Sequence, residues 1–106
     1  MWRVEYLDER SKLEVELLPR DAQASFARIV AMIVSSGLER MREPYVKHLD
    51  GKLWEMRLSG GDGIARSIYV TATGRRVVVL RSFVKKTQKT PPRELDIARE
   101  RAKEVM

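Results

Sequence analysis

Basic side chains in the second half of the chain are the residues best suited to chemistry. Residues 63–93 contain no Asp or Glu, although the chain has 15 acidic residues among its 106. Eight basic residues fall in this acid-free stretch: Arg66, Arg75, Arg76, Arg81, Lys85, Lys86, Lys89 and Arg93. A field of one sign attracts a polyanion such as nucleic acid, or an acidic protein. A solubilising surface or a basic tail would have the same composition, but these residues lie in strand-like segments, which favours a binding surface.

Side chains of this kind can catalyse RNA cleavage without a metal. When the 2′-hydroxyl of RNA attacks the adjacent phosphate, the phosphorane gains negative charge that guanidinium groups can stabilise. The same groups can hold the backbone for in-line attack. The proton transfers still need an acid and a base. A lysine among other cations has a lowered pKa and could serve; Glu55 could also accept a proton, and no residue is an obvious base.

Other catalytic sites are harder to build from this composition. His48 is the only histidine, so a His-dependent triad or a two-histidine ribonuclease site is excluded, and we expect His48 at the surface of a loop. The chain has no cysteine and therefore no disulfide or thiolate metal site. Between residue 52 and Glu94 the only carboxylates are Glu55 and Asp62, so we predict no metal and no cofactor. The sequence GGDG at residues 60–63 is too short for a phosphate-binding loop and predicts a hairpin turn.

Length and composition predict one cytoplasmic domain over residues 1–106. Hydrophobic residues make up 43% of the chain and charged residues 34%. The longest apolar run is residues 29–34, which is too short to span a bilayer. The N-terminal residues mix acidic and apolar side chains and lack the apolar region of a signal peptide. The charge is unevenly distributed, because residues 1–51 sum to −1 and residues 52–106 to +7.

The N-terminal half predicts a strand followed by two helices. Residues 2–7 alternate apolar and charged side chains, as in a strand. Asp8 could cap a helix over about residues 9–18, and a second helix runs from Asp21 to a stop at Gly37. The apolar side of the first helix is predicted to be Leu13, Leu17 and Leu18, and that of the second Phe26, Ile29, Val30, Ile33 and Val34. Residues 38–51 show no sustained period and predict a connector.

The C-terminal half predicts three strands and a helix. Residues 52–58 alternate, with Trp54, Met56 and Leu58 on one face and Glu55 and Arg57 on the other. Residues 64–70 and 76–84 are rich in β-branched side chains and are joined by a hairpin around Thr73-Gly74. Thr90 could cap a last helix with Pro91 at its first position. The order β-αα-βββ-α indicates an α+β fold whose antiparallel sheet is packed by helices.

The hairpin register predicts where the cations lie. If the turn has two central residues, Arg66 lies opposite Arg81 across the hairpin. Opposed like charges are unfavourable, so a fold tolerates them best where an anion sits between them. Lys85 would share the Arg81 face, and Arg57 on the neighbouring strand would lie close by. The alternative is that these arginines splay into solvent or that one of them pairs with Glu55.

Three segments resemble a known family. LWEMR at residues 53–57, GIARSIYV at 63–70 and above all FVKKTQKTP at 83–91 are similar to the RelE/HigB superfamily of toxins, in its phage-derived HigB-like branch. The resemblance covers nearly the whole chain and implies a RelE-like fold. It also implies a type II toxin, an endoribonuclease that cuts mRNA at translating ribosomes. The implied partners are mRNA, the ribosome and a helix-turn-helix antitoxin of the HigA type, with no membrane.

The resemblance also assigns site residues. It implies a catalytic surface formed by Arg57, Arg66, Lys85 and Lys86. Other cations of the acid-free stretch are expected to bind RNA, namely Arg76, Arg81, Lys89 and Arg93. The sequence departs from the family pattern at Glu55, where RelE itself often has a basic residue. It departs again at Arg81, where the HigB-like branch often has histidine, and this departure leaves the general base undefined.

Two other functions fit the same charge pattern. One is a non-catalytic module that binds RNA or the ribosome, and the other is a basic face that docks an acidic protein. Aromatic residues do not decide between them, because Tyr69 and Trp54 are expected in the core. Tyr45 lies in the predicted connector and could stack on RNA.

Overall fold

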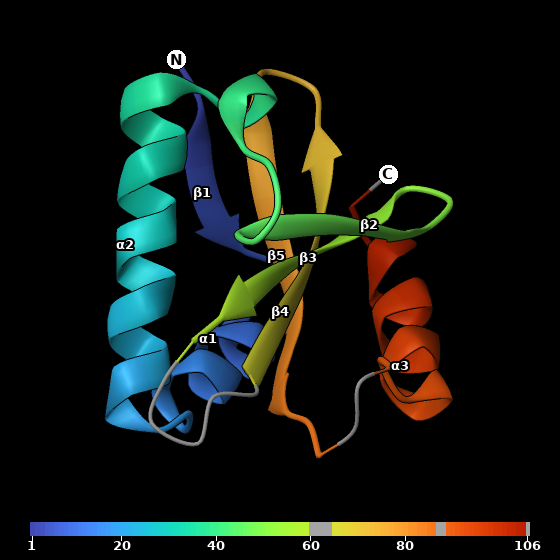
Figure 1. The fold of residues 1–106 in the computed structure, drawn as a ribbon. Helices are drawn as coiled ribbons and strands as arrows, with labels where there is room; N and C mark the ends of the chain where they lie inside the picture. The colour runs from blue at the N-terminus through green and yellow to red at the C-terminus, as the bar shows by residue number, and fades with distance from the viewer. Residues whose placement is uncertain (60–64, 87–88, 106) are drawn as a thin grey trace.

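The protein is an α+β fold, seen in a computed structural model that describes residues 1–59, 65–86 and 89–105. A twisted sheet lies between helix α2 on one side and helix α3 on the other (Figure 1). The elements in chain order are β1 (Arg3–Tyr6), α1 (Glu9–Glu16), α2 (Arg20–Ser36), the 3-10 turn η1 (Leu38–Arg40), β2 (Val46–Asp50), β3 (Leu53–Leu58), β4 (Ala65–Ala72), β5 (Arg76–Val84) and α3 (Pro92–Ala102). The predicted class and the order of the predicted elements are confirmed, with one strand added. Among the described residues, no helix combines the length and the apolar character needed to cross a bilayer.

The five strands are arranged in the order β1-β5-β4-β3-β2. The β3–β4 and β4–β5 pairs are antiparallel, as predicted, and the added strand β2 pairs antiparallel with β3. Strand β1 differs, because it pairs in parallel with β5, with Val4 opposite Val77. The sheet is therefore mixed. The first strand of the chain therefore lies next to the last strand, in the same sheet.

Strand β2 corrects the prediction that residues 38–51 form a connector. It is an edge strand whose only neighbour is β3. Val46 is buried, whereas Lys47, His48 and Asp50 are exposed. An edge strand buries few side chains, so its sequence carries little alternation to find it by. The 3-10 turn η1 occupies another part of the same segment.

Helix α1 begins as predicted but buries a different face. Asp8 is its N-cap and accepts hydrogen bonds from the backbone of Arg10 and Ser11. The predicted apolar side is wrong for Leu13 and Leu17, which are 53% and 74% exposed, whereas Leu18 is buried in the core as predicted. Ser11 and Val15 are buried instead. Ser11 can be buried because its hydroxyl donates to the Asp8 carbonyl oxygen, so no polar group is left without a partner.

Two apolar cores lie on the two faces of the sheet. On the α2 side, Phe26, Ile29 and Ile33 pack with Met56 and Tyr69 as predicted, although Val34 is 37% exposed. Helix α2 ends where Gly37 adopts a φ of 92°, which favours glycine. On the other side, α3 contributes Ala98 to a cluster that includes Ile68, Val70 and Leu80.

The start of α3 and the turn of the last hairpin correct two further predictions. Helix α3 begins at Pro92, and its N-cap is Pro91 and not Thr90. The hairpin turn has three central residues, so Ala72 pairs with Arg76. Arg75 supplies the extra residue with a φ of 56°.

A second irregularity moves the arginines apart. The β4–β5 register shifts between Ile68 and Tyr69, where β5 holds one extra residue. As a result Arg66 lies opposite Phe83, and Arg81 lies opposite Ile68. The predicted apposition of Arg66 and Arg81 is wrong. Both errors arise because bulges and longer turns depend on packing in three dimensions, not on the local pattern.

Candidate functional site

Arg57 and Arg66 are brought together by the pairing of β3 with β4. Their Cα atoms are direct partners in the antiparallel register. On β3, Leu53 belongs to the core under α3, so the alternating residues Glu55 and Arg57 point to the same face of the sheet. The guanidinium groups of Arg57 and Arg66 therefore lie side by side. Arg57 was expected close to Arg66, but the residue predicted directly opposite Arg66 was Arg81.

A buried carboxylate holds Arg66 in place. Glu55 Oε2 lies 3.5 Å from Arg66 Nε, and the side chains are 3% and 8% exposed. Arg66 also donates to the Ala65 carbonyl oxygen at 2.8 Å, and Thr90 Oγ1 donates to Glu55 Oε1 at 3.0 Å. This ion pair matches the alternative drawn from the sequence, in which one of the two arginines pairs with Glu55. Arg66 Nε is buried and forms no hydrogen bond within the described residues.

Burial and charge both act on the Arg66 guanidinium. Its removal from water lowers its pKa, the nearby Glu55 carboxylate opposes that change, and Arg57 adds to it. Arginine stays protonated in proteins regardless of such changes. The site therefore keeps a positive charge at Arg66 in a region from which water is largely excluded, where a charge interacts strongly with a phosphate.

Lys85 completes a cluster of cations from three neighbouring strands. It directly follows β5 and is only 4% exposed. Burial lowers the pKa of its ammonium group, Arg66 lowers it further and Glu55 raises it, with smaller lowering effects from Arg57 and Lys47. Arg57, Arg66 and Lys85 are thus close enough to interact electrostatically. We call these three residues the cationic cluster.

A basic pocket of about 220 Å³ opens beside this cluster. Arg28 from α2, Arg57 from β3 and Arg66 from β4 line it together with Tyr45. The Ser59 backbone N–H donates to Ser25 Oγ at 3.1 Å, which ties the end of β3 to α2 at the pocket wall. Three guanidinium groups and an aromatic ring around one opening form a site for an anionic group with an attached ring.

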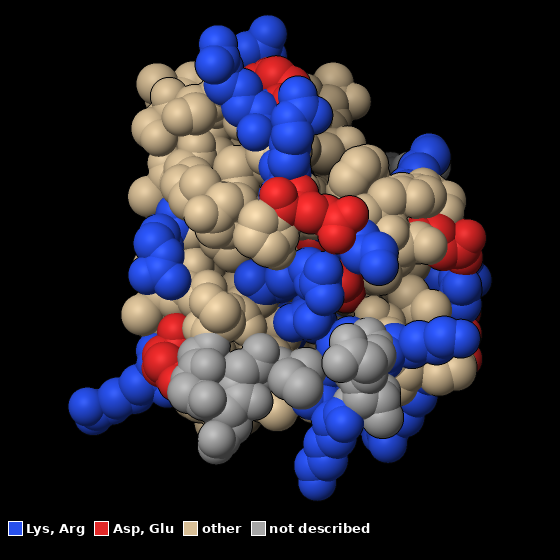
Figure 2. All heavy atoms as spheres, viewed as in Figure 1, with Lys and Arg blue, Asp and Glu red and all other residues tan. Residues whose placement is uncertain are grey.

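One weak ion pair crosses the basic pocket's rim. Glu43 Oε1 lies 3.5 Å from Arg57 Nη1, and the Glu43 side chain is 65% exposed. Exposed pairs of this type contribute little and are easily exchanged for another anion. Figure 2 shows Lys and Arg side chains gathered in the middle of this face, with acidic side chains directly beside them.

The other predicted site residues fall into two groups. Lys86, Lys89 and Arg93 are exposed. Arg76 and Arg81 instead form ion pairs within the fold. Arg76 binds Glu5 of β1, and Arg81 binds Glu14 of α1 and Glu94 of α3 at 2.7 Å each. Lys85 interacts electrostatically with Arg66. These positions indicate that Arg76 and Arg81 connect elements of the fold.

The aromatic residues and His48 lie partly as expected. Tyr69 is in the core as predicted and is 1% exposed. Trp54 is not in the core, because 39% of it is exposed. His48 lies on the exposed edge strand β2, where its Nε2 is 2.8 Å from the Gly51 carbonyl oxygen. The loop predicted at residues 60–63 lies outside the described residues.

Arg28 was missed in the sequence prediction of the site, and Tyr45 was only weighed as a residue that stacks on RNA. Arg28 is an exposed residue on the polar side of α2, so nothing in the helical pattern separates it from a solvated arginine. Tyr45 reaches the pocket because it directly precedes β2, and its carbonyl oxygen accepts a hydrogen bond from the Arg57 backbone. Only recognition of β2 as a strand would have placed it there. Among the described residues, no three His, Asp or Glu side chains are grouped as metal ligands would be.

Comparison with known proteins identifies the class to which this fold and this site belong. Residues 14–103 match the family described as "Phage derived protein Gp49-like (DUF891)". The match covers most of the chain, so the protein belongs to the Gp49-like family. It includes every member of the cationic cluster. No curated protein matches the chain with significant similarity.

Proposed function

We propose that the protein is the toxin of a type II toxin–antitoxin pair and an mRNA endoribonuclease that acts at the ribosome. The observation that carries the proposal is the convergence of Arg57, Arg66 and Lys85 from three neighbouring strands. Membership of the Gp49-like family supports it, since this family resembles HigB-like toxins. The toxin domain would comprise residues 1–106, and its inhibitor would be a helix-turn-helix antitoxin of the HigA type.

In the proposed reaction the scissile phosphate binds between Arg57 and Arg66. The 2′-oxygen of the preceding ribose forms a bond to phosphorus, and the bond from phosphorus to the 5′-oxygen breaks. The two guanidinium groups stabilise the charge of the phosphorane. Products are a 2′,3′-cyclic phosphate and a 5′-hydroxyl end.

Lys85 is the proposed proton acceptor. Its lowered pKa makes loss of the ammonium proton easier than for an exposed lysine. In its neutral form the amine takes the proton from the 2′-hydroxyl, while water protonates the leaving oxygen. Glu55 is a poorer acceptor, because it is 2% exposed and already bound to Arg66 and Thr90. We assign Glu55 the role of positioning Arg66.

The exposed cations extend the proposed RNA path. Lys86 follows Lys85 directly, Lys89 lies before α3, and Arg93 is in the first turn of α3. We propose that these three contact phosphates outside the cleaved bond. Arg76 and Arg81 contribute less to RNA binding, because carboxylates of the fold already hold them.

The test is to map RNA ends produced by the purified protein on free mRNA and on translating ribosomes. Wild-type protein should generate new 5′-hydroxyl ends. Arg57→Ala should lower the cleavage rate about 10²- to 10³-fold, as loss of a donor to a developing charge does elsewhere. Lys103→Ala is the matched control, since it removes the same charge from a side chain that is 72% exposed and pairs with Glu100 within its own helical end.

The same experiment separates the nuclease from a binding module. If folded wild-type protein binds RNA or ribosomes but produces no new ends on either substrate, the protein is a non-catalytic module and the nuclease proposal is wrong. Equal activity of Arg57→Ala and Lys103→Ala would also contradict the assigned site.

A further inference from the structure

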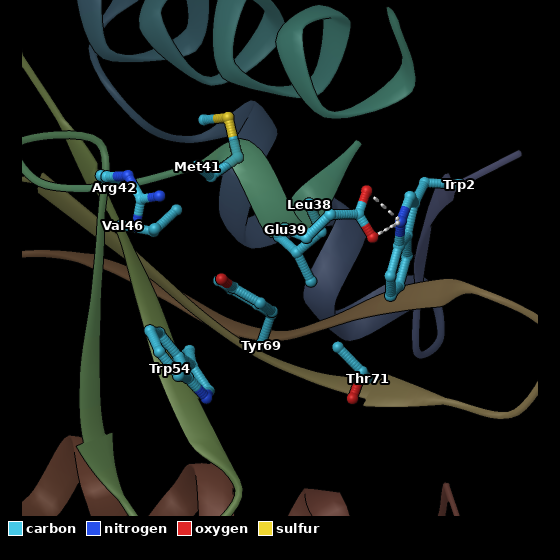
Figure 3. A pocket seen from close by; sticks show the side chains of 9 residues that line it. All are labelled: Trp2, Leu38, Glu39, Met41, Arg42, Val46, Trp54, Tyr69 and Thr71. Carbon is cyan, nitrogen blue, oxygen red and sulfur yellow. Dashed lines mark hydrogen bonds between the residues drawn. The ribbon is translucent and has the colours of Figure 1, made fainter. Parts of the chain in front are cut away.

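A second pocket of about 440 Å³ lies between η1 and strands β3 and β4 (Figure 3). Its size and mainly apolar walls are those of a small-ligand site. Trp54 and Tyr69 are direct partners across β3 and β4, so their rings are adjacent on the same face of the sheet. Trp2, which directly precedes β1, forms the far wall. We call this the aromatic pocket.

The polar groups of the aromatic pocket are few. Trp2 Nε1 donates to both carboxylate oxygens of Glu39 at 3.2 Å, so Glu39 is already engaged. The Tyr69 hydroxyl points toward the side of the pocket that holds Arg42 and Val46 (Figure 3). Within the described part of the chain, this hydroxyl makes no hydrogen bond, and Thr71 adds a second hydroxyl to the wall. Flat apolar surfaces with two hydroxyls match the faces and edges of a heterocyclic ring.

The mouth of the aromatic pocket is cationic. Arg42 is exposed and lines both this pocket and an adjoining groove of about 570 Å³. Lys47 and His48 of β2 line the same groove with Trp54. Glu43 also lines it, but its carboxylate pairs with Arg57. A ligand that enters here meets positive charge first and aromatic rings second, which excludes a purely apolar ligand and favours an anionic one.

The aromatic pocket is also connected to the basic pocket. Tyr45 lines the basic pocket, whereas its neighbour in the chain, Val46, lines the aromatic pocket. The backbone hydrogen bond from Arg57 to Tyr45, 2.8 Å long, fixes this segment to β3. A single strand with a phosphate at Arg57 can therefore pass over the Arg42–Lys47 segment without leaving the protein.

We propose that the aromatic pocket binds one unpaired base of a single-stranded RNA, stacked on Trp54 beside a phosphate held by Arg42. The identity of the ligand as RNA rests on the proposed function, and the pocket adds a base-binding subsite to it. An apolar side chain of a protein partner would also fit the walls, but it would make no use of Arg42, Lys47 or the Tyr69 hydroxyl.

The probe is a 2′-O-methyl RNA hexanucleotide, which cannot be cut because its 2′-oxygen is blocked. The chain has two tryptophans, so Trp2→Phe leaves Trp54 as the only one. In this variant the hexanucleotide should quench tryptophan fluorescence as it binds. Trp54→Leu should weaken binding about 5- to 100-fold, the range expected for loss of one stacked base.

Three controls separate base stacking from other effects. Tyr6→Leu removes an aromatic residue of similar exposure at 36% on β1 and should not change binding. Arg42→Gln alters an exposed residue, so it should weaken binding without affecting the folding of the protein. A hexanucleotide with one abasic position should bind wild type less well, yet the Trp54→Leu variant about as well as the intact hexanucleotide, because the missing base has then lost its partner.

The outcomes distinguish this inference from the nuclease proposal. Unchanged Trp54 fluorescence together with unchanged affinity of a folded Trp54→Leu variant would overturn the base-binding subsite, even if RNA is cut. A Trp54→Leu variant that loses binding to a protein partner but still binds the hexanucleotide as well as wild type would also overturn it. Quenching and weakened binding without any RNA cleavage would support the subsite and refute the nuclease.

Discussion

Lys85 is the residue whose burial and proposed role are most closely linked. A lysine that is 4% exposed and close to Arg66 and Arg57 keeps its charge at a cost. Its pKa in the folded protein lies below the ordinary value of 10.5. Proteins retain such unfavourable groups mainly at functional sites, and the same shift that costs stability would ease proton loss in the proposed role of Lys85 as a proton acceptor.

The sign of this effect predicts how stability depends on pH. Between the folded pKa of Lys85 and 10.5, the unfolded chain binds more protons than the folded protein, so stability rises with pH. Below the folded pKa the full cost is present. Lys85→Met should therefore raise the free energy of unfolding at pH 7 by about 0.5–2 kcal/mol while abolishing cleavage. This gain should shrink as the pH approaches 10.

Urea unfolding of both proteins from pH 6 to 10 measures this prediction. Lys52→Met is the matched control, since Lys52 is exposed and the change should stay within about 0.5 kcal/mol. A Lys85→Met variant that is less stable than wild type across the whole pH range would show that the ammonium group is favourably placed and would remove its assignment as a proton acceptor.

Glu55 illustrates a different principle at the same scale. A carboxylate that is 2% exposed is tolerated because Arg66 and Thr90 bind it and Lys85 lies near it. Thr90 precedes α3, so this contact connects the last helix to the arginine of the site. Arg66 is therefore oriented by groups from β3, β4 and the segment before α3, and this reduces its freedom before any ligand binds.

At the scale of the elements, the hairpin between β4 and β5 sets the position of the cationic cluster. Its turn contains two consecutive residues with positive φ, Gly74 at 87° and Arg75 at 56°. Glycine adopts such a conformation readily, but arginine does so at a cost of about 1–2 kcal/mol. Arg75→Gly should accordingly raise the free energy of unfolding by about 0.5–1 kcal/mol, since the greater flexibility of unfolded glycine offsets part of the gain.

Chemical denaturation tests this prediction with Arg75→Ala beside it. Alanine removes the same exposed side chain and keeps the strained backbone, so its stability should match that of wild type. A gain in Arg75→Ala equal to that in Arg75→Gly would mean that the side chain's charge, and not its backbone, is responsible. Cleavage activity should be the same in all three proteins, because the turn lies at the opposite end of the hairpin from Arg66.

The elements also explain which parts of the fold could be predicted from the sequence. Strands β3, β4 and β5 were predictable because each alternates or is rich in β-branched residues, and the pairing of Arg57 with Arg66 follows from two of them. Edge strand β2 was not predictable, since it pairs only with β3 in the sheet and Val46 is its one buried residue. The register shift between Ile68 and Tyr69 was not predictable either, because a bulge depends on packing in three dimensions and leaves no mark on the local pattern.

At the scale of the whole molecule, the cations behind the net charge of +6 differ in their surroundings. Several cations are neutralised within the fold. Arg76 binds Glu5, Arg81 binds Glu14 and Glu94, and Arg101 also binds Glu14 at 2.9 Å. Arg57 of the cationic cluster differs from these, because its partner Glu43 is 65% exposed and can be exchanged for a phosphate. Charge that is free to exchange its counterions, and not total charge, decides how strongly a polyanion binds.

This division predicts the salt dependence of RNA binding. The logarithm of the binding constant falls linearly with the logarithm of salt concentration, with a slope of about −0.7 for each phosphate contact to a single strand. Arg57→Gln should reduce the magnitude of the slope by about 0.7, because its partner Glu43 is 65% exposed and yields to a phosphate. Arg76→Gln should leave the slope unchanged, since Arg76 already binds Glu5.

Titration of the same hexanucleotide from 50 to 300 mM salt, with all three proteins shown to be folded, measures both slopes. The two variants remove equal charge, so a general effect of net charge would change both slopes equally. Equal slopes for Arg57→Gln and Arg76→Gln would therefore mean that RNA responds to the overall field of the protein. A change in Arg57→Gln alone would place one phosphate in the basic pocket, where the proposed cleavage occurs.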